Sequence, residues 1–287
     1  MLSVNNPPLY SPLYLRRFLA IVICCLSLAF IKAGWSLFVS ADSNAAAAFA
    51  AAAEQNANLK FDLIWTFSAR PQRGWYLYVP LIQRLIDTDS APETKAFAQA
   101  LADWQRSVGL ASTGVLSQET WMKMVAVFQS RRIKDRSTLP TERLTLAPAS
   151  EFFDPERPES LRGVERQAYE AYKELVAAAA TDLSLSSNEN WLKIISAFRS
   201  PAYQAQLRKQ NPRSGRGSLA VNSPHFTGRA LDLYVGGEPV STDDRNRAIQ
   251  VNTKVYQWLV KNAERYGFYP YFYEPWHWEY NPQLSAE

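Results

Sequence analysis

The chain contains only two histidines, and each lies close in sequence to a carboxylate. His225 is followed seven residues later by Asp232, and Glu274 stands three residues before His277. Two neutral imidazoles and one carboxylate form a ligand set that holds a catalytic zinc ion and leaves its fourth position open. The sequence therefore predicts zinc bound by His225, Asp232 and His277, with Glu274 as the base that accepts a proton from water.

Each of these residues also has a simpler interpretation. A single histidine is more often a structural residue than a ligand, and Glu274 alone would be a solvated charge at the end of a strand. The metal site is favoured because two histidines and two carboxylates occur together at short spacing.

A strand is expected to carry the predicted ligand Asp232. Residues 229–235 have a strand-like composition, in which Leu231 and Leu233 point to the side opposite Asp232. We expect that opposite side to be buried. His225 is expected in the loop that enters this strand.

Hydrophobic periodicity and capping residues predict the other elements of the C-terminal half. Ser200 is expected to cap one helix and Ser241 another, and Glu274 and His277 are expected to follow the last strand. The expected elements are helices over residues 161–180, 201–212 and 241–266, strands over 191–198 and 268–273, and an exposed loop over 213–217. We therefore expect an α+β domain over residues 160–287, in which helices flank a small antiparallel sheet.

Two amphipathic helices are expected upstream of this domain. Apolar residues recur at spacings of four, three and four from Phe97 to Val108, and Gly109 ends that helix. Ser117 is expected to cap the second helix. The expected upstream segments are an Ala-rich tether over residues 42–60, a small all-α domain over 61–130 and a Pro-rich linker over 131–159.

The first 41 residues have the pattern of an export signal. Arg16 and Arg17 precede a continuous apolar run from Phe18 to Ile31, and a small-residue pattern ends at Ala41. The run is shorter than the roughly 20 apolar residues of a membrane span. We expect an exported protein of the periplasm or cell envelope, with a retained anchor in the inner membrane as the alternative to cleavage.

The composition is that of a globular protein with a modest charge. Hydrophobic residues make up 47% and charged residues 20% of the 287 residues, which is enough for two folded units with real cores. The formal net charge of +4 is far from the dense basic surface that nucleic-acid binding requires. We therefore expect no nucleic-acid partner.

Three segments around the candidate ligands resemble the VanY-type D-alanyl-D-alanine carboxypeptidases, part of a wider group with lysostaphin-like peptidases and hedgehog domains. Residues 223–232 are similar to the signature S-x-H-x-x-G-x-A-x-D, and residues 274–277 are similar to its E-x-x-H element. Residues 196–200 resemble an S-G-Y-R-S element, with Ala197 and Phe198 as departures beside the arginine. The resemblance extends over about residues 160–282.

The resemblance implies a zinc peptidase with roles for particular residues. It implies zinc on His225, Asp232 and His277, with Glu274 as the base. It also implies that Arg199 binds the peptide carboxylate or polarises the scissile carbonyl. The further substrate contacts that it implies are Ser223, Gln204 and Trp276, although core packing explains Trp276 equally well.

A weaker resemblance concerns the upstream helices. Residues 103–121 are similar to the peptidoglycan-binding domain common in wall hydrolases, while a generic helical hairpin is the alternative. Together with the export signal, the resemblances imply a zinc-dependent peptidase that acts on peptidoglycan stem peptides, removing the terminal D-alanine of a D-Ala-D-Ala end. The alternatives are an L,D-carboxypeptidase or endopeptidase on the same scaffold, and a non-catalytic wall-binding protein.

Overall fold

The computed structural model describes residues 46–182, 185, 188–212 and 219–285. Contacts divide the chain into two compact units, Met1–Ala51 and Ala52–Glu287. The predicted export signal and the predicted exposed loop over residues 213–217 lie outside the described residues. No described helix combines the length and apolar character needed to cross a membrane.

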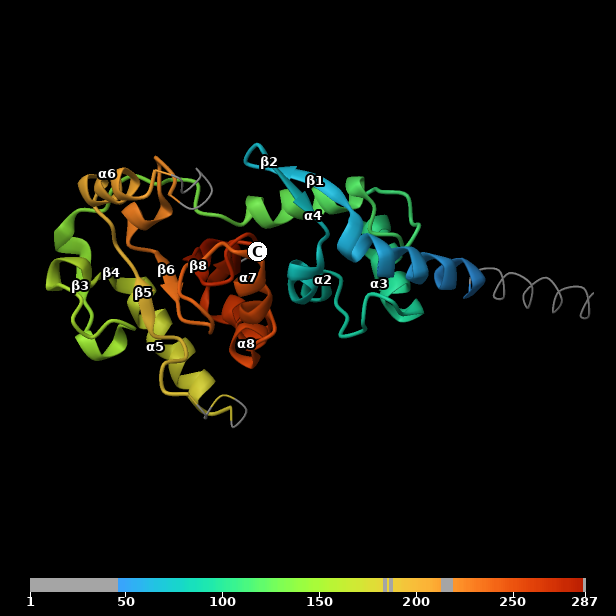
Figure 1. Cartoon of the computed structure of the whole chain (residues 1–287). Helices are drawn as coiled ribbons and strands as arrows, with labels where there is room; N and C mark the ends of the chain where they lie inside the picture. Colours follow the sequence, from blue (N-terminus) through green and yellow to red (C-terminus); the bar gives the residue numbers. More distant parts are fainter. Residues whose placement is uncertain (1–45, 183–184, 186–187, 213–218, 286–287) are drawn as a thin grey trace, which may run out of the picture. The chain divides into compact units, whose positions relative to one another are not determined.

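A four-stranded antiparallel sheet forms the centre of the C-terminal half. Its strands are β5 (Ile194–Ser196), β6 (Ala230–Leu233), β8 (His277–Tyr280) and β7 (Phe268–Pro270), in that spatial order. The register places Asp232 of β6 opposite His277 of β8 (Figure 1). The sheet therefore brings together two predicted ligands that are 45 residues apart.

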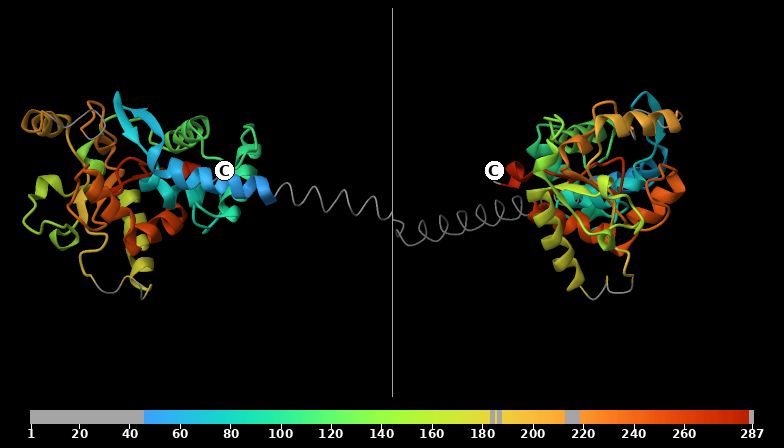
Figure 2. Two further views of the ribbon diagram at one scale, coloured as in Figure 1. Left: turned by 45° about the vertical axis from the view of Figure 1, so that its right-hand side comes forward. Right: turned by 90° about the vertical axis from the view of Figure 1, so that its left-hand side faces the viewer.

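Four helices accompany this sheet, as the predicted α+β class requires. They are α5 (Arg166–Ala180), α6 (Pro201–Gln210), α7 (Asp244–Val251) and α8 (Lys254–Asn262) (Figure 2). Ser200 caps α6 by accepting a hydrogen bond from the backbone of Tyr203, as the sequence predicted. Leu231 and Leu233 are fully buried beneath the sheet, as expected.

Three boundaries in this half differ from the sequence predictions. The helix predicted from residue 161 begins only at Arg166, because Gly163–Glu165 form β4, which pairs with β3 (Leu144–Leu146). The single helix predicted over 241–266 is two helices, capped by Asp243 and Thr253 rather than by Ser241. The last strand is β8, which contains His277, whereas the strand predicted over 268–273 stops at Pro270.

The upstream region contains the two predicted helices and an unpredicted hairpin. The helices α3 (Lys95–Ser107) and α4 (Gln118–Ser130) lie where periodicity placed them, and the Ser117 hydroxyl caps α4. The additional elements are β1 (Ile64–Phe67), β2 (Arg70–Arg73) and α2 (Val79–Leu85).

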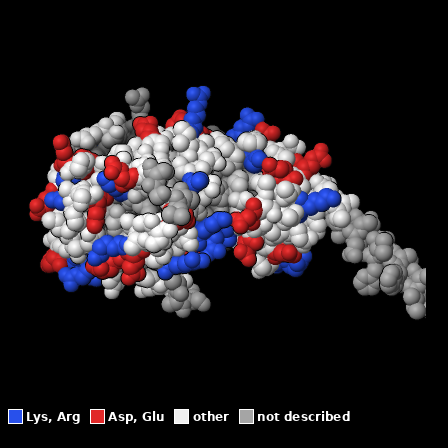
Figure 3. Space-filling model, turned by 90° about the horizontal axis from the view of Figure 1, so that it is seen from below, with Lys and Arg blue, Asp and Glu red and all other residues white. Residues whose placement is uncertain are grey.

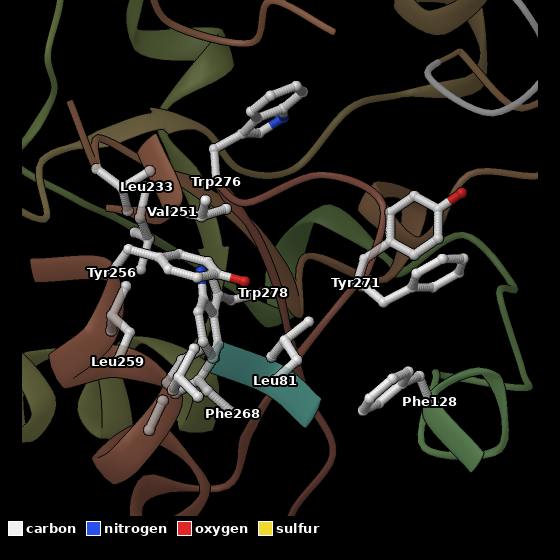
Figure 4. Packing of buried hydrophobic residues seen from close by; sticks show 14 of the residues in the cluster. Leu81, Phe128, Leu233, Val251, Tyr256, Leu259, Phe268, Tyr271, Trp276 and Trp278 are labelled. Atoms are coloured by element: carbon white, nitrogen blue, oxygen red, sulfur yellow. The ribbon is translucent and has the colours of Figure 1, made fainter. Parts of the chain in front are cut away.

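The upstream region and the C-terminal sheet share one hydrophobic core. In Figure 4, Leu81 of α2 lies near Trp278 of β8, and Phe128 of α4 belongs to the same cluster of buried side chains. The ring of Phe272 lies 6.1 Å from that of Phe128 and also meets rings of the β1–β2 hairpin. This aromatic packing joins residues on both sides of the predicted linker.

The segments predicted as tether and linker contribute buried residues. The chain is helical over residues 46–62, and the buried side chain of Asn56 bonds the backbone of Gly114 and Leu116. In the predicted linker, Phe152 is fully buried and β3 is paired. The predicted linker is thus anchored by apolar side chains. Their spacing is too irregular to show a periodic pattern in the sequence.

Candidate metal centre

The side chains of His225, Asp232 and His277 meet at one buried point of the sheet. Each offers a ligand atom, and these atoms all lie within 4.8 Å of one another. His225 Nε2 is 3.4 Å from Asp232 Oδ2, and His277 Nδ1 is 2.9 Å from Asp232 Oδ1. The structure thus assembles the three residues that the sequence predicted as metal ligands.

A short turn of helix presents His225 to this point. Residues Pro224–Thr227 form a 3₁₀ helix, and the hydroxyl of Ser223 caps it by accepting from the backbone N–H of His225. Gly228 ends the turn with a φ of 65°, and a Cβ there would lie 2.9 Å from the backbone nitrogen of Glu165. The glycine of the 223–232 motif is therefore needed both for its backbone conformation and for close packing.

Hydrogen bonding fixes which nitrogen of His225 faces Asp232. Nδ1 lies 2.7 Å from the carbonyl oxygen of Ala197, and a carbonyl can only accept, so Nδ1 carries the proton. Nε2 then presents its lone pair toward Asp232. Burial lowers the pKa of His225 to about 4, and the charge of Arg199 adds to this effect. His225 is accordingly a neutral imidazole with a defined ligand atom.

His277 lies between two carboxylates. Its Nδ1 faces Asp232, and its Nε2 lies 3.2 Å from Oε1 of Glu279, two residues along the same strand. Burial alone would lower the pKa of His277, but the hydrogen bonds to Asp232 and Glu279 outweigh burial and raise it to about 9. The two carboxylates therefore stabilise positive charge at the His277 ring.

Arg199 completes the polar surroundings of Asp232. Its Nη2 donates to Asp232 Oδ2, and its Nε donates to the hydroxyl of Ser196 at 2.8 Å. Burial opposes ionisation of Asp232, but the charge of Arg199 and the hydrogen bond with His277 outweigh burial and hold the pKa of this carboxyl well below its usual value. Asp232 is thus an anion on which the cationic groups converge.

Glu274 lies in the cavity beside this cluster, where a turn places it. The backbone N–H of His277 donates to the Glu274 carbonyl at 3.0 Å, so the E-x-x-H segment forms a tight turn leading into β8. The carboxylate is buried, and its Oε1 has no hydrogen-bond partner among the described residues. Burial raises the pKa of Glu274 to about 7. An acid of that strength exchanges protons readily near neutral pH.

The other predicted substrate contacts surround the same cavity at different depths. Ser223, Trp276 and Arg199 line the cavity, which has a volume of about 430 Å³. Gln204 is buried behind it and donates to the carbonyl of Ala220, which does line the cavity. Gln204 therefore supports the wall of the cavity.

Sequence reasoning missed two side chains that hold His277 in place. Glu279 accepts from His277 and also from Arg132 Nε at 2.8 Å and the backbone N–H of Ile133 at 2.7 Å. The guanidinium of Arg132 lies over the ring of Tyr271, 3.8 Å from its centroid. Strand alternation could have found Glu279, which shares a face of β8 with His277. No local signal pointed to Arg132, 147 residues away.

A family model and a solved structure are each similar to part of the chain. Residues 162–283 match the family model VanY, D-alanyl-D-alanine carboxypeptidase. The chain is also similar to a solved structure of the LdcB LD-carboxypeptidase, which is described as revealing the molecular basis of peptidoglycan recognition. The two share 24% sequence identity, with a TM-score of 0.38. That match covers 53% of this chain and 73% of the other. No curated protein matches the chain. Residues 162–283, which contain all three candidate ligands and Glu274, are therefore similar to the VanY family of D-alanyl-D-alanine carboxypeptidases.

Proposed function

We propose that this protein is a zinc-dependent peptidoglycan peptidase that removes the terminal D-alanine from stem peptides ending in D-Ala-D-Ala. The observation that carries the proposal is the buried cluster of His225, Asp232 and His277, with the unpaired carboxylate oxygen of Glu274 in the same cavity. The similarity of residues 162–283 to the VanY family supports the reaction class.

The donor set fits zinc on three counts. Ligand atoms held tetrahedrally at about 2.1 Å from zinc lie about 3.4 Å apart, which is the distance between His225 Nε2 and Asp232 Oδ2. Both imidazoles have a second hydrogen bond that fixes the ring, from His225 to Ala197 and from His277 to Glu279. The set of two nitrogens and one carboxylate also leaves a coordination position for substrate or water.

Zinc held by these residues would act as a Lewis acid on the scissile carbonyl and lower the pKa of a water molecule. Glu274 accepts the proton of the attacking water and returns it to the leaving amine, a role that suits its raised pKa. Arg199 lines the cavity with two of its nitrogens held by Ser196 and Asp232. Its Nη1 has no hydrogen-bond partner among the described residues and is available to the substrate carbonyl or carboxylate.

The test is a digest of purified peptidoglycan with fragments identified by mass. Release of D-alanine from pentapeptide stems, abolished in Glu274→Gln while zinc content stays normal, is the expected result. Loss of D-alanine only from tetrapeptide stems would indicate an L,D-carboxypeptidase instead. Conversion of cross-linked dimers to monomers would indicate an endopeptidase. Normal turnover by Glu274→Gln would refute the assignment of the base.

Export to the cell envelope is part of the proposal, supported by the pattern of residues 1–41 and by the similarity of the C-terminal domain to the VanY family. The peptide stems of the wall are then the partner. Residues 61–130 are proposed as a module that contacts the wall, and residues 131–159 as its connection to the peptidase domain. Cell fractionation with sequencing of the mature N-terminus separates cleavage after Ala41 from a retained membrane anchor, and a cytoplasmic location would refute export.

A further inference from the structure

The cavity beside the metal centre is unusually rich in arginine. Its charged lining consists of four arginines and only two acids, Asp232 and Glu274. The arginines are Arg132, Arg136, Arg157 and Arg199. On the face shown in Figure 3, acidic and basic side chains both occur, with one continuous group of basic side chains near the centre. The described lining of this cavity thus carries more basic than acidic side chains.

Two of the four arginines are neutralised by the protein. Arg199 forms an ion pair with Asp232, and Arg132 forms one with Glu279. Both partners are almost fully buried. The charges of these two arginines are therefore balanced by a candidate metal ligand and by the carboxylate that holds His277, while Nη1 of Arg199 remains available to substrate.

The other two arginines form no direct ion pair in the described part of the chain, although Glu279 lies near enough to act on Arg136, and Asp232 and Asp154 on Arg157. Arg136 donates from Nε to the carbonyl of Ile133 and from Nη1 to that of Asn222. Arg157 donates from Nε to the carbonyl of Leu161. Neither forms an ion pair with a described carboxylate. Backbone carbonyls thus hold Nε and Nη1 of Arg136 and Nε of Arg157. Nη2 of Arg136 and both terminal nitrogens of Arg157 are left for a ligand.

Such an arrangement favours an anionic ligand. Both side chains are partly buried, and burial together with a neighbouring arginine lowers the pKa of each guanidinium in spite of the acids nearby, so the charge is only partly compensated. A carboxylate can accept short charge-assisted hydrogen bonds from both terminal nitrogens of Arg157 and from the remaining Nη2 of Arg136. A ligand with a carboxylate at each arginine would give each of them a direct ion pair.

We propose that Arg136 and Arg157 each bind a carboxylate of the substrate, so that the preferred peptide carries two: its C-terminal carboxylate and a second one on a side chain. This inference rests on the proposed function and names the class of stem peptide, one whose diamino acid bears a free carboxylate rather than an amide or no acid. Both arginines lie outside residues 162–283. The preference is therefore supplied by the connecting segment and not by the family domain.

Four synthetic peptides test the proposal. They share one sequence and differ in having an acid or an amide at the C-terminus and an acid or an amide on the side chain. Wild-type kcat/KM is expected to fall by about 10- to 100-fold for each acid replaced by an amide, the effect of one charge-assisted hydrogen bond. Arg136→Gln and Arg157→Gln are each expected to lose discrimination at one of the two positions and keep it at the other.

A matched control and a binding assay complete the experiment. Arg143→Gln removes an exposed arginine of the same segment that does not line the cavity, and it should discriminate like the wild type. Arg136→Lys and Arg157→Lys keep the charge without the fork and should discriminate partially. Melting temperature and zinc content of each variant identify any that misfold, and calorimetric binding of the four peptides gives the discrimination independently of turnover.

The outcomes separate this inference from the proposed function. If the wild type cleaves all four peptides equally, the two carboxylate contacts are refuted while the peptidase stands. If no peptide is cleaved, the proposed function fails, and the binding assay still decides whether the arginines recognise carboxylates. An equal loss across all four peptides in the glutamine variants would show a structural role and overturn the proposal.

Discussion

Replacing Glu279 by glutamine tests whether the metal centre depends on the carboxylate behind His277. The two oxygens of Glu279 accept from His277 Nε2, from the guanidinium of Arg132 and from the backbone N–H of Ile133. All the donors converge on a side chain that is 1% exposed. Glutamine preserves the shape of glutamate but has a single oxygen acceptor, so its amide NH₂ must face at least one of these donors.

The size of the effect follows from these contacts. Loss of a carboxylate that orients a ligating histidine typically lowers metal affinity by about 10- to 100-fold. That range corresponds to about 1.4–2.8 kcal/mol. Independently of metal, a buried donor left without an acceptor costs about 1–3 kcal/mol of unfolding free energy. We expect Glu279→Gln to show both losses.

The assay is a zinc titration in competition with a chromophoric chelator, paired with urea unfolding of the metal-free protein. Arg132→Gln should weaken zinc binding less than Glu279→Gln, because the hydrogen bond to His277 remains. Asp103→Asn, which breaks an exposed ion pair with Arg106, is the control and should change neither quantity appreciably. Wild-type zinc affinity in Glu279→Gln would refute the view that Glu279 positions His277.

Three further predictions concern the reaction, the metal and the core. Glu274 must be ionised to accept a proton, and burial raises its pKa, so kcat/KM should fall about tenfold per pH unit below that pKa. The pKa is expected between 4.5 and about 7, because the positive charge of zinc lowers the pKa from the upper value. A pH profile that stays flat down to 4.5 would contradict this. A chelator should abolish activity and lower the melting temperature, and added zinc should restore both. At a zinc concentration 1,000 times Kd, about 4 kcal/mol of stabilisation is expected. Activity that survives dialysis against chelator would count against a metal enzyme. Phe272→Ala should destabilise the protein by about 3–5 kcal/mol in urea unfolding, because the ring of Phe272 contacts α4 and the β1–β2 hairpin. Residues 52–287 should still unfold in one transition. Two separate transitions in the wild type would show that the core is not shared.

The candidate ligands could be predicted because their information is local in sequence. His225, Gly228 and Asp232 lie within one turn and the strand that follows it, so their types and spacing record the geometry directly. The helices α3 and α4 were equally accessible, since each has a regular apolar face and a capping side chain at its start. Their positions in the structure agree with the sequence to within about two residues.

Features that depend on contacts between distant segments could not be predicted in this way. The break between α7 and α8 is an example, because apolar residues continue through it and only the side chain of Thr253, which caps α8 and bonds the carbonyl of Val235, marks the interruption. Likewise, β4 was included in a helix because its pairing with β3 lies in a segment whose prolines indicated a linker. In both places a tertiary contact overrode a continuous local pattern.

The metal centre itself shows why the family domain does not contain the whole site. The E-x-x-H pattern ends at His277, yet the side chain that orients this histidine lies two residues beyond it and is in turn paired with Arg132, upstream of residue 162. Removing everything before residue 162 would leave the Glu279 carboxylate buried without its cation, and breaking a buried pair from one side costs about 3–5 kcal/mol. It would also expose Phe272 and Trp278, which pack against upstream residues. The segment that carries Arg132 is therefore structurally part of the catalytic domain, and the arginines of the same segment are in a position to determine which peptides that domain accepts.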